Sequence, residues 1–103
     1  GKKAMTGTSG PGVALKSEAI GLASMAEIPL VIVNVMRGGP STGLPTKFEQ
    51  ADLFQAMYGT SGDAPKAILA PTDVEDTYVC GNIAFNIAER YQLPVFVLTD
   101  QFL

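Results

Sequence analysis

Short apolar runs and longer helix-forming stretches alternate along this chain. The apolar runs are residues 3–8, 30–35, 66–69 and 95–99. The second run is apolar at every position except Asn34, which is typical of a strand that is buried on both faces of a sheet. The helix-forming stretches are residues 13–26, residues 47–58, and a third stretch that begins within residues 71–75 and ends at about residue 91. The pattern therefore predicts that strands and helices alternate, beginning and ending with a strand.

This order predicts a doubly wound, mainly parallel α/β sheet with helices on both faces. Parallel strands need a crossover connection, usually a helix, and these crossovers are right-handed. Pro29 and Pro94 each mark the change from a helix to the next strand, because the residue before a proline avoids helical backbone angles. At 103 residues the chain is one domain or part of one.

The spacing of residues within the helices predicts which side chains face the sheet. The candidate inward positions of the second helix are Phe48, Ala51, Leu53 or Phe54, and Met57. In the third helix we expect Cys80 to be a core residue rather than a reactive thiol. Its expected neighbours at helical spacing are Ala84, Ile87 and Tyr91. Thr72 and Glu75 have the spacing of a capping box at the start of this helix.

The loop after the second strand is the main candidate for a ligand site. Residues 34–46 read NVMRGGPSTGLPT, and the glycines and prolines in this run prevent a regular strand or a long helix. Loops at the carboxyl ends of parallel strands are where open α/β sheets bind ligands. Arg37 is the one cation in the run, and its planar guanidinium suits a carboxylate or phosphate. We therefore expect Arg37 to bind an anionic substrate group; the alternative is a solvated arginine on a surface turn.

A glycine-rich turn follows the first strand. Gly7, Gly10 and Gly12 follow the order G-x-x-G-x-G, which differs from the dinucleotide-binding order, and Asn34 stands where an acidic residue would end the second strand. The turn could present backbone donors to an anion or a polar ring at the start of the next helix. Equally, it could be a connection that simply needs glycine.

The composition excludes several classes of function. The net charge of −3 gives no basic face, so nucleic acid and anionic membrane are not expected partners. No apolar run approaches the roughly 20 residues of a membrane-spanning helix. Without histidine and with a single cysteine, the chain has no internal disulfide, no expected metal site and no histidine-activated nucleophile.

We expect a structural role rather than a catalytic one for the clustered acidic residues. The cluster at the predicted start of the third helix consists of Asp73, Glu75 and Asp76. The helix dipole accounts for this cluster, since carboxylates are favoured in the first turn. Asp100 ends the last strand and is a further candidate to line the same edge of the sheet as Arg37.

Four segments together resemble a known family. They are AMTGTSGPG at residues 4–12, EAIGLASMAEIPLVIVNVMRGGPSTGLPTKFEQADL at residues 18–53, APTDVED at residues 70–76 and AERYQLPVFVLTDQFL at residues 88–103. In this combination the chain is similar to the α subunit of 2-oxoacid:ferredoxin oxidoreductases, and RGGPSTGLPT is the most specific part. The resemblance implies the pyrimidine-binding domain of thiamine diphosphate enzymes, which agrees with the predicted doubly wound sheet.

The resemblance also implies an activity and a set of site residues. The expected reaction is the oxidative decarboxylation of a 2-oxoacid with coenzyme A, giving an acyl-CoA, carbon dioxide and reduced ferredoxin. In the family, the arginine matching Arg37 contacts the substrate carboxylate, and the threonine matching Thr46 lies near the substrate side chain. The turn formed by Ser9, Gly10, Pro11 and Gly12 is expected near the aminopyrimidine of the cofactor.

The remaining implications concern cofactors and partners. Thiamine diphosphate with Mg²⁺ is expected to be shared with a β subunit, and an iron–sulfur cluster is expected in a partner subunit rather than in this chain. Further γ and δ subunits, coenzyme A, ferredoxin and a cytoplasmic location are expected too. The family's glutamate that protonates the aminopyrimidine and its YPITP segment have no match here. We therefore expect part of one pyrimidine-binding domain, lacking its N-terminal segment, with no catalytic residue of its own and inactive alone.

Two alternatives to this interpretation remain from the sequence. One is a non-oxidative thiamine enzyme of the acetolactate-synthase type, because TSGPG also occurs in that group. The other is a non-catalytic α/β scaffold module that only supports a partner.

Overall fold

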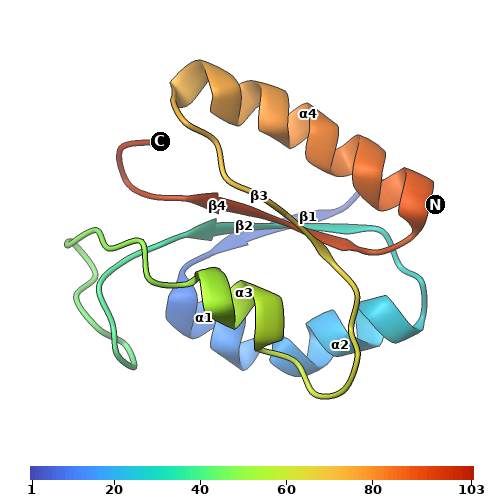
Figure 1. Ribbon diagram of the computed structural model, residues 1–103, viewed down its shortest axis with the longest axis horizontal. Helices are drawn as coiled ribbons and strands as arrows, with labels where there is room; N and C mark the ends of the chain where they lie inside the picture. Colours follow the sequence, from blue (N-terminus) through green and yellow to red (C-terminus); the bar gives the residue numbers. More distant parts are fainter.

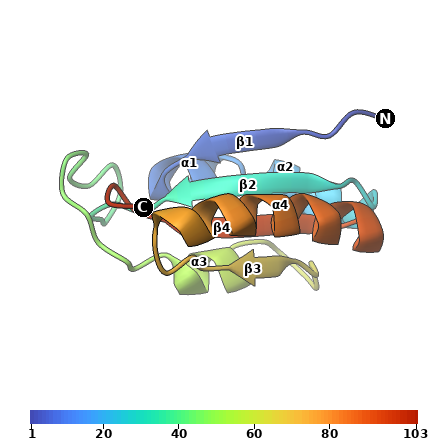
Figure 2. The same ribbon diagram turned by 90° about the horizontal axis from the view of Figure 1, so that it is seen from above.

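The computed structural model describes residues 1–103 as a parallel sheet with helices on both faces (Figure 1). In chain order the elements are β1 (Met5–Thr8), α1 (Gly10–Leu15), α2 (Ser17–Met25), β2 (Leu30–Val35), α3 (Leu53–Tyr58), β3 (Ala67–Leu69), α4 (Val74–Tyr91) and β4 (Pro94–Thr99). The strand order is β1-β2-β4-β3, and every neighbouring pair is parallel (Figure 2). Helix α4 covers one face, while α1, α2 and α3 cover the other. The predicted fold class is confirmed.

Strand β4 shows why the apolar runs are continuous. All of its residues are buried, and they point alternately into two cores. Phe96 and Leu98 face the helices α1 to α3, whereas Val95 and Val97 face α4. A strand that is covered on both sides needs an apolar residue at each position, which is the pattern seen in the sequence.

The predicted helix over residues 47–58 is wrong in its first half, because α3 begins only at Leu53. Residues 47–50 instead hold the preceding loop: the carbonyl of Lys47 accepts from the Gly38 amide, and the Gln50 side chain donates to Asp100. The predicted inward positions were wrong as well. Ala56 is the buried residue of α3, while the five proposed positions, Phe48, Ala51, Leu53, Phe54 and Met57, are exposed.

The predicted helix over residues 13–26 is two helices. The first helix begins earlier than predicted, at Gly10. Lys16 interrupts the helical run, because it is the C-cap of α1 and the N-cap of α2. The bounds of β2 agree with the prediction, and the other strands differ from it by one or two residues at their start. The N-terminal strand begins at Met5, β3 begins at Ala67 and β4 begins at Pro94.

The N-cap of α4 lies one residue after Thr72, the predicted cap. Asp73 is the N-cap, and its carboxylate accepts from the Asp76 amide at 2.8 Å. The Asp76 carboxylate in turn accepts from the Thr72 amide at 2.9 Å, so Thr72 is a donor rather than the cap, and Glu75 is exposed. The predicted structural role of these carboxylates is confirmed, because they stabilise the helix start.

The predicted core position of Cys80 is confirmed. It is buried with Ala84 against the sheet, and burial is the main cause that raises the pKa of its thiol. Tyr91 was wrongly expected on this face and is exposed; Ala88 takes the position one turn earlier, and Ile87 is half-buried. No helix of the protein has the length and apolar character that crossing a membrane requires.

Candidate functional site

The carboxyl ends of β1, β2 and β4 meet at one edge of the sheet, where the long loop of residues 37–50 extends beyond the strands (Figure 2). At this edge the Met36 amide still donates to the Thr99 carbonyl at 2.7 Å, which fixes the start of the loop against β4. Ligand sites of parallel α/β sheets lie at such an edge. The structure therefore places the predicted loop where a ligand site is expected.

The loop closes on itself through backbone contacts. The Leu44 amide donates to the Gly38 carbonyl, and the Gly38 amide donates to the Lys47 carbonyl, each at 2.8 Å. Gly43 has a φ of 61°, and a Cβ added there would lie 1.8 Å from the Gly38 carbonyl oxygen. Only glycine fits at this position, so the glycine content of the motif has a structural reason.

The returning arm of the loop is fastened to the chain after β4. Gln50 donates to the Asp100 carboxylate at 2.8 Å, and the rings of Phe48 and Phe102 meet edge to face at 5.2 Å. The hydrogen bond from Gln50, followed by that from the Phe102 amide, lowers the pKa of Asp100. Asp100 lies at the same edge as Arg37, but it does not line either pocket that Arg37 lines. Its carboxylate is used to hold the arm.

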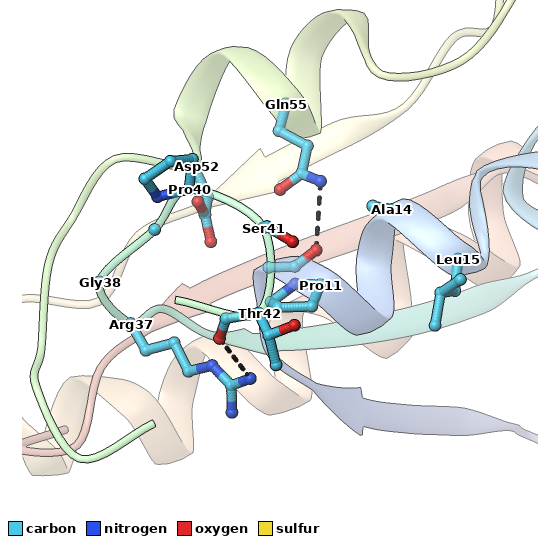
Figure 3. A pocket seen from close by; sticks show the side chains of 12 residues that line it. Pro11, Ala14, Leu15, Arg37, Gly38, Pro40, Ser41, Thr42, Asp52 and Gln55 are labelled. Carbon is cyan, nitrogen blue, oxygen red and sulfur yellow. Dashed lines mark hydrogen bonds between the residues drawn. The ribbon is translucent and has the colours of Figure 1, made fainter. Parts of the chain in front are cut away.

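Arg37 lies between two pockets. The half-buried guanidinium donates through Nη2 to the Thr42 carbonyl at 2.9 Å, whereas the buried Nε has no partner (Figure 3). The first pocket, of about 450 Å³, lies between the loop, α1 and α3; the second, of about 410 Å³, lies among the strand ends. Arg37 therefore lines both cavities, and its Nε is a buried donor without a partner.

The two pockets differ in charge. Asp52 lines the first pocket together with Arg37, so opposite charges share that cavity. The second pocket is lined by Arg37 with Thr8, Ser9 and Gln101 among its polar residues, and no carboxylate side chain contributes to it. Because like charges repel, an anion is favoured in the second pocket, and a group that carries hydrogen-bond donors is favoured in the first.

The turn after β1 contributes to both pockets. Ser9 lines the second pocket, while Gly10 and Pro11 line the first. Gly12 lines neither, but a Cβ there would lie 1.7 Å from the Thr8 hydroxyl oxygen, so glycine lets α1 pack closely against the end of β1. The structure thus brings Ser9, Gly10 and Pro11 together with Arg37.

The remaining residues of the site are Thr46, Asp52 at the start of α3, and Gln55 within α3. Thr46 is exposed and lines neither pocket, although its neighbour Pro45 lines the second, so its expected role stays a prediction. Sequence reasoning missed Asp52 and Gln55, which line the first pocket. The one signal of this contact was the polar Asn34 within an apolar strand, since Asn34 bonds to Asp52. No group of three or more carboxylates or thiols is placed to hold a metal ion.

A doubly wound α/β domain with an arginine loop and a glycine turn at one sheet edge is the class that this fold and site define. Residues 1–103 match the family described as pyruvate flavodoxin/ferredoxin oxidoreductase, thiamine diP-bdg. The chain belongs to this family, and the resemblance found in the sequence is confirmed.

Curated relatives share this sequence over nearly its whole length. The chain is 54% identical over 100 residues to the 2-oxoglutarate oxidoreductase subunit KorA of Mycobacterium tuberculosis, covering 97% of this chain and 15% of the relative. It is 50% identical over 101 residues to the 2-oxoglutarate synthase subunit KorA of Methanocaldococcus jannaschii, covering 98% and 28%. The chain thus spans less than a third of the length of these relatives.

A solved structure has the same fold. It is a 2-oxoglutarate:ferredoxin oxidoreductase from Magnetococcus marinus with 2-oxoglutarate, coenzyme A and succinyl-CoA bound. The TM-score is 0.96 at 55% identity, and the match covers 99% of this chain and 18% of that one. These comparisons support the ferredoxin oxidoreductase interpretation over the acetolactate-synthase and scaffold alternatives.

Proposed function

We propose that this chain forms one wall of the substrate and thiamine diphosphate site in the α subunit of a 2-oxoacid:ferredoxin oxidoreductase. The assembled enzyme oxidatively decarboxylates a 2-oxoacid with coenzyme A, and yields an acyl-CoA, carbon dioxide and reduced ferredoxin. The observation that carries the proposal is the guanidinium of Arg37, which is held at the end of β2 with one buried donor unpaired. The names of the relatives support the same activity.

Arg37 is suited to hold the acid group that leaves as carbon dioxide. Its Nη2 is fixed by the Thr42 carbonyl, so the plane of the guanidinium is set before a ligand arrives. A carboxylate in the second pocket would pair with the guanidinium of Arg37, which lines that pocket. This pairing orients the carbon–carbon bond that breaks.

The residues of the chain fit a cofactor on the other side of Arg37. A pocket of about 450 Å³ is within the range for small-molecule sites, and its lining includes donors such as Arg37 and an acceptor, Asp52. We place Ser9, Gly10, Pro11 and Gly12 near the aminopyrimidine, and Thr46 near the substrate side chain. When bound, thiamine diphosphate supplies an electron sink for decarboxylation.

Other groups are proposed to come from partner subunits. Mg²⁺, the diphosphate site and the iron–sulfur cluster are assigned to a β subunit or its neighbours, with γ and δ subunits as further partners. Coenzyme A and ferredoxin are proposed to bind through the complex, in the cytoplasm. 2-Oxoglutarate is the first substrate to test because of the relatives' names. Its second carboxylate has no cation in either pocket besides Arg37, so residues outside this chain are expected to meet it.

The test is Arg37→Ala in the assembled enzyme, measured as ferredoxin reduction dependent on the 2-oxoacid and coenzyme A. We expect a loss of about 2–4 kcal/mol in transition-state stabilisation, since the variant removes one partner of a desolvated charge pair. This corresponds to a fall of roughly 30- to 900-fold in kcat/KM. Arg37→Lys should recover part of the loss, because a lysine supplies the charge without the planar fork.

The matched control is Arg90→Ala, an exposed arginine on α4. It should leave kcat and KM unchanged. If Arg37→Ala leaves KM for the 2-oxoacid and kcat unchanged as well, Arg37 is not a substrate ligand. Turnover of the 2-oxoacid without electron transfer to ferredoxin would contradict the assignment to oxidative chemistry.

A further inference from the structure

Asp52 lies where the two predicted ligand segments meet. Its carboxylate accepts a hydrogen bond from the side-chain Nδ2 of Asn34 at 3.0 Å, and Asn34 is three residues before Arg37. The same carboxylate packs against Gly10, where an added Cβ would lie 2.9 Å from the nearer oxygen. Asp52 thus contacts the end of β2 and the turn after β1 at once.

The first turn of α3 makes a second contact with the same turn. Gln55 points from α3 toward α1 and donates to the Gly10 carbonyl at 3.2 Å (Figure 3). Apart from Ala56, the apolar side chains of α3 are exposed, so little apolar burial fixes this helix. Polar contacts from Asp52 and Gln55 therefore carry much of the placement of α3 beside the pocket.

Asn34 depends on Asp52. Its side chain is 1% exposed, its Nδ2 donates to Asp52, and its Oδ1 has no partner. Removing the carboxylate would leave the whole buried side-chain amide of Asn34 without a protein partner, which is costly for a buried polar group. The β2 end would then shift to find other partners.

We propose that Asp52 is a positioning residue that holds the Arg37 loop and the Ser9–Gly12 turn in register across the first pocket. It acts through Asn34 and Gly10. This role requires that the side chain at position 52 accept a hydrogen bond and have the shape of Asp, and it does not require a negative charge. The inference rests on the proposed function, because the register matters for activity only if both segments bind ligands. A displacement of about 1 Å between such segments can reduce a rate by roughly 100-fold.

The experiment compares Asp52→Ala and Asp52→Asn in the assembled enzyme. Alanine removes the acceptor and should lower kcat/KM for the 2-oxoacid by roughly 10- to 100-fold. Asparagine keeps an oxygen that can accept from Asn34, and it should stay within about threefold of wild type. Asn34→Ala combined with Asp52→Ala should cost little more than Asp52→Ala alone, since both remove the same contact.

Amide hydrogen exchange measures directly, without an activity assay, whether the two segments stay in place. Amide hydrogen exchange should become faster in residues 9–15 and 34–50 of Asp52→Ala, while α4 and β4 remain protected. The matched control is Glu89→Ala, an exposed carboxylate near the end of α4, which should change neither exchange nor kcat/KM.

Three outcomes overturn the proposal. In the first, Asp52→Asn is as impaired as Asp52→Ala, so the charge itself is required. In the second, Asp52→Ala lowers only the melting temperature. In the third, Asp52→Ala and Asp52→Asn both have normal activity although Arg37→Ala is impaired. The proposed function then stands and the positioning role fails. If Arg37→Ala is normal too, the proposed function itself has failed.

Discussion

The centre of the sheet and the loop at its carboxyl edge are held by different kinds of contact. Strand β4 is buried along its length and fills two apolar cores. The loop of residues 37–50 is largely exposed, and backbone hydrogen bonds, the Gln50–Asp100 pair and one aromatic contact hold its shape. This difference indicates that substitutions can affect the fold and the site separately. Substitutions in β4 should destabilise the whole domain, whereas substitutions in the loop should first disturb the site.

The largest effect is expected from Phe96→Ala in β4. The ring is 1% exposed within the core that also includes Ile32 and Leu98, so its removal leaves a cavity. We expect the free energy of unfolding of the α subunit to fall by about 3–5 kcal/mol, measured by denaturant titration. Phe54→Ala is the control, because this ring is 72% exposed. A loss below about 1 kcal/mol for Phe96→Ala would contradict the claim that the apolar core at β4 stabilises the whole domain.

A smaller effect, confined to the loop, is expected from Gly43→Ala. The new Cβ would collide with the Gly38 carbonyl, and the backbone there is left-handed. We expect a cost of about 1–3 kcal/mol together with faster hydrogen exchange in residues 37–50. Gly62→Ala is the matched control, since Gly62 is also left-handed but has nothing within 4 Å of an added Cβ. Equal effects of the two variants would show that the loop does not need the close approach at Gly43.

The smallest effect is a pH dependence at Asp100. Its pKa in the folded protein is lowered from 3.8, chiefly by the bond from Gln50. A lowered folded pKa means that this stabilisation is present above the unfolded value and is lost as the pH falls through the folded value. The stability advantage of wild type over Asp100→Asn should therefore shrink as the pH drops below about 4. The exposed loop carboxylate in Asp63→Asn provides the control, and an advantage that is constant with pH would contradict this role.

Much of the fold could be predicted from the sequence because it depends on local apolar pattern. The bounds of β2 were predicted correctly and those of β4 to within one residue, since a strand covered on both faces is apolar at each position. The helix over residues 47–58 failed for the opposite reason. Its composition favours a helix, but the backbone of Lys47 and the side chain of Gln50 are bound by partners distant in sequence.

The site was predictable only in part. Arg37 stood out because it is the one cation in a glycine-rich loop after a buried strand, and the structure places it beside two pockets. Asp52 did not stand out, because its bond to Asn34 joins residues 18 apart. The polar Asn34 within an apolar strand indicates that a partner exists, but it does not indicate which residue that partner is. Thr46 was expected from the family resemblance alone, and its role stays a prediction.

The central claim is that Arg37 holds the acid group of the substrate. The most direct measurement is the inhibition constant of a 2-oxoacid analogue and of its uncharged methyl ester, in wild type and in Arg37→Ala. The account predicts that wild type prefers the acid and that Arg37→Ala loses this preference by about 30- to 900-fold while binding the ester as before. An equal preference for the acid in both enzymes would contradict it.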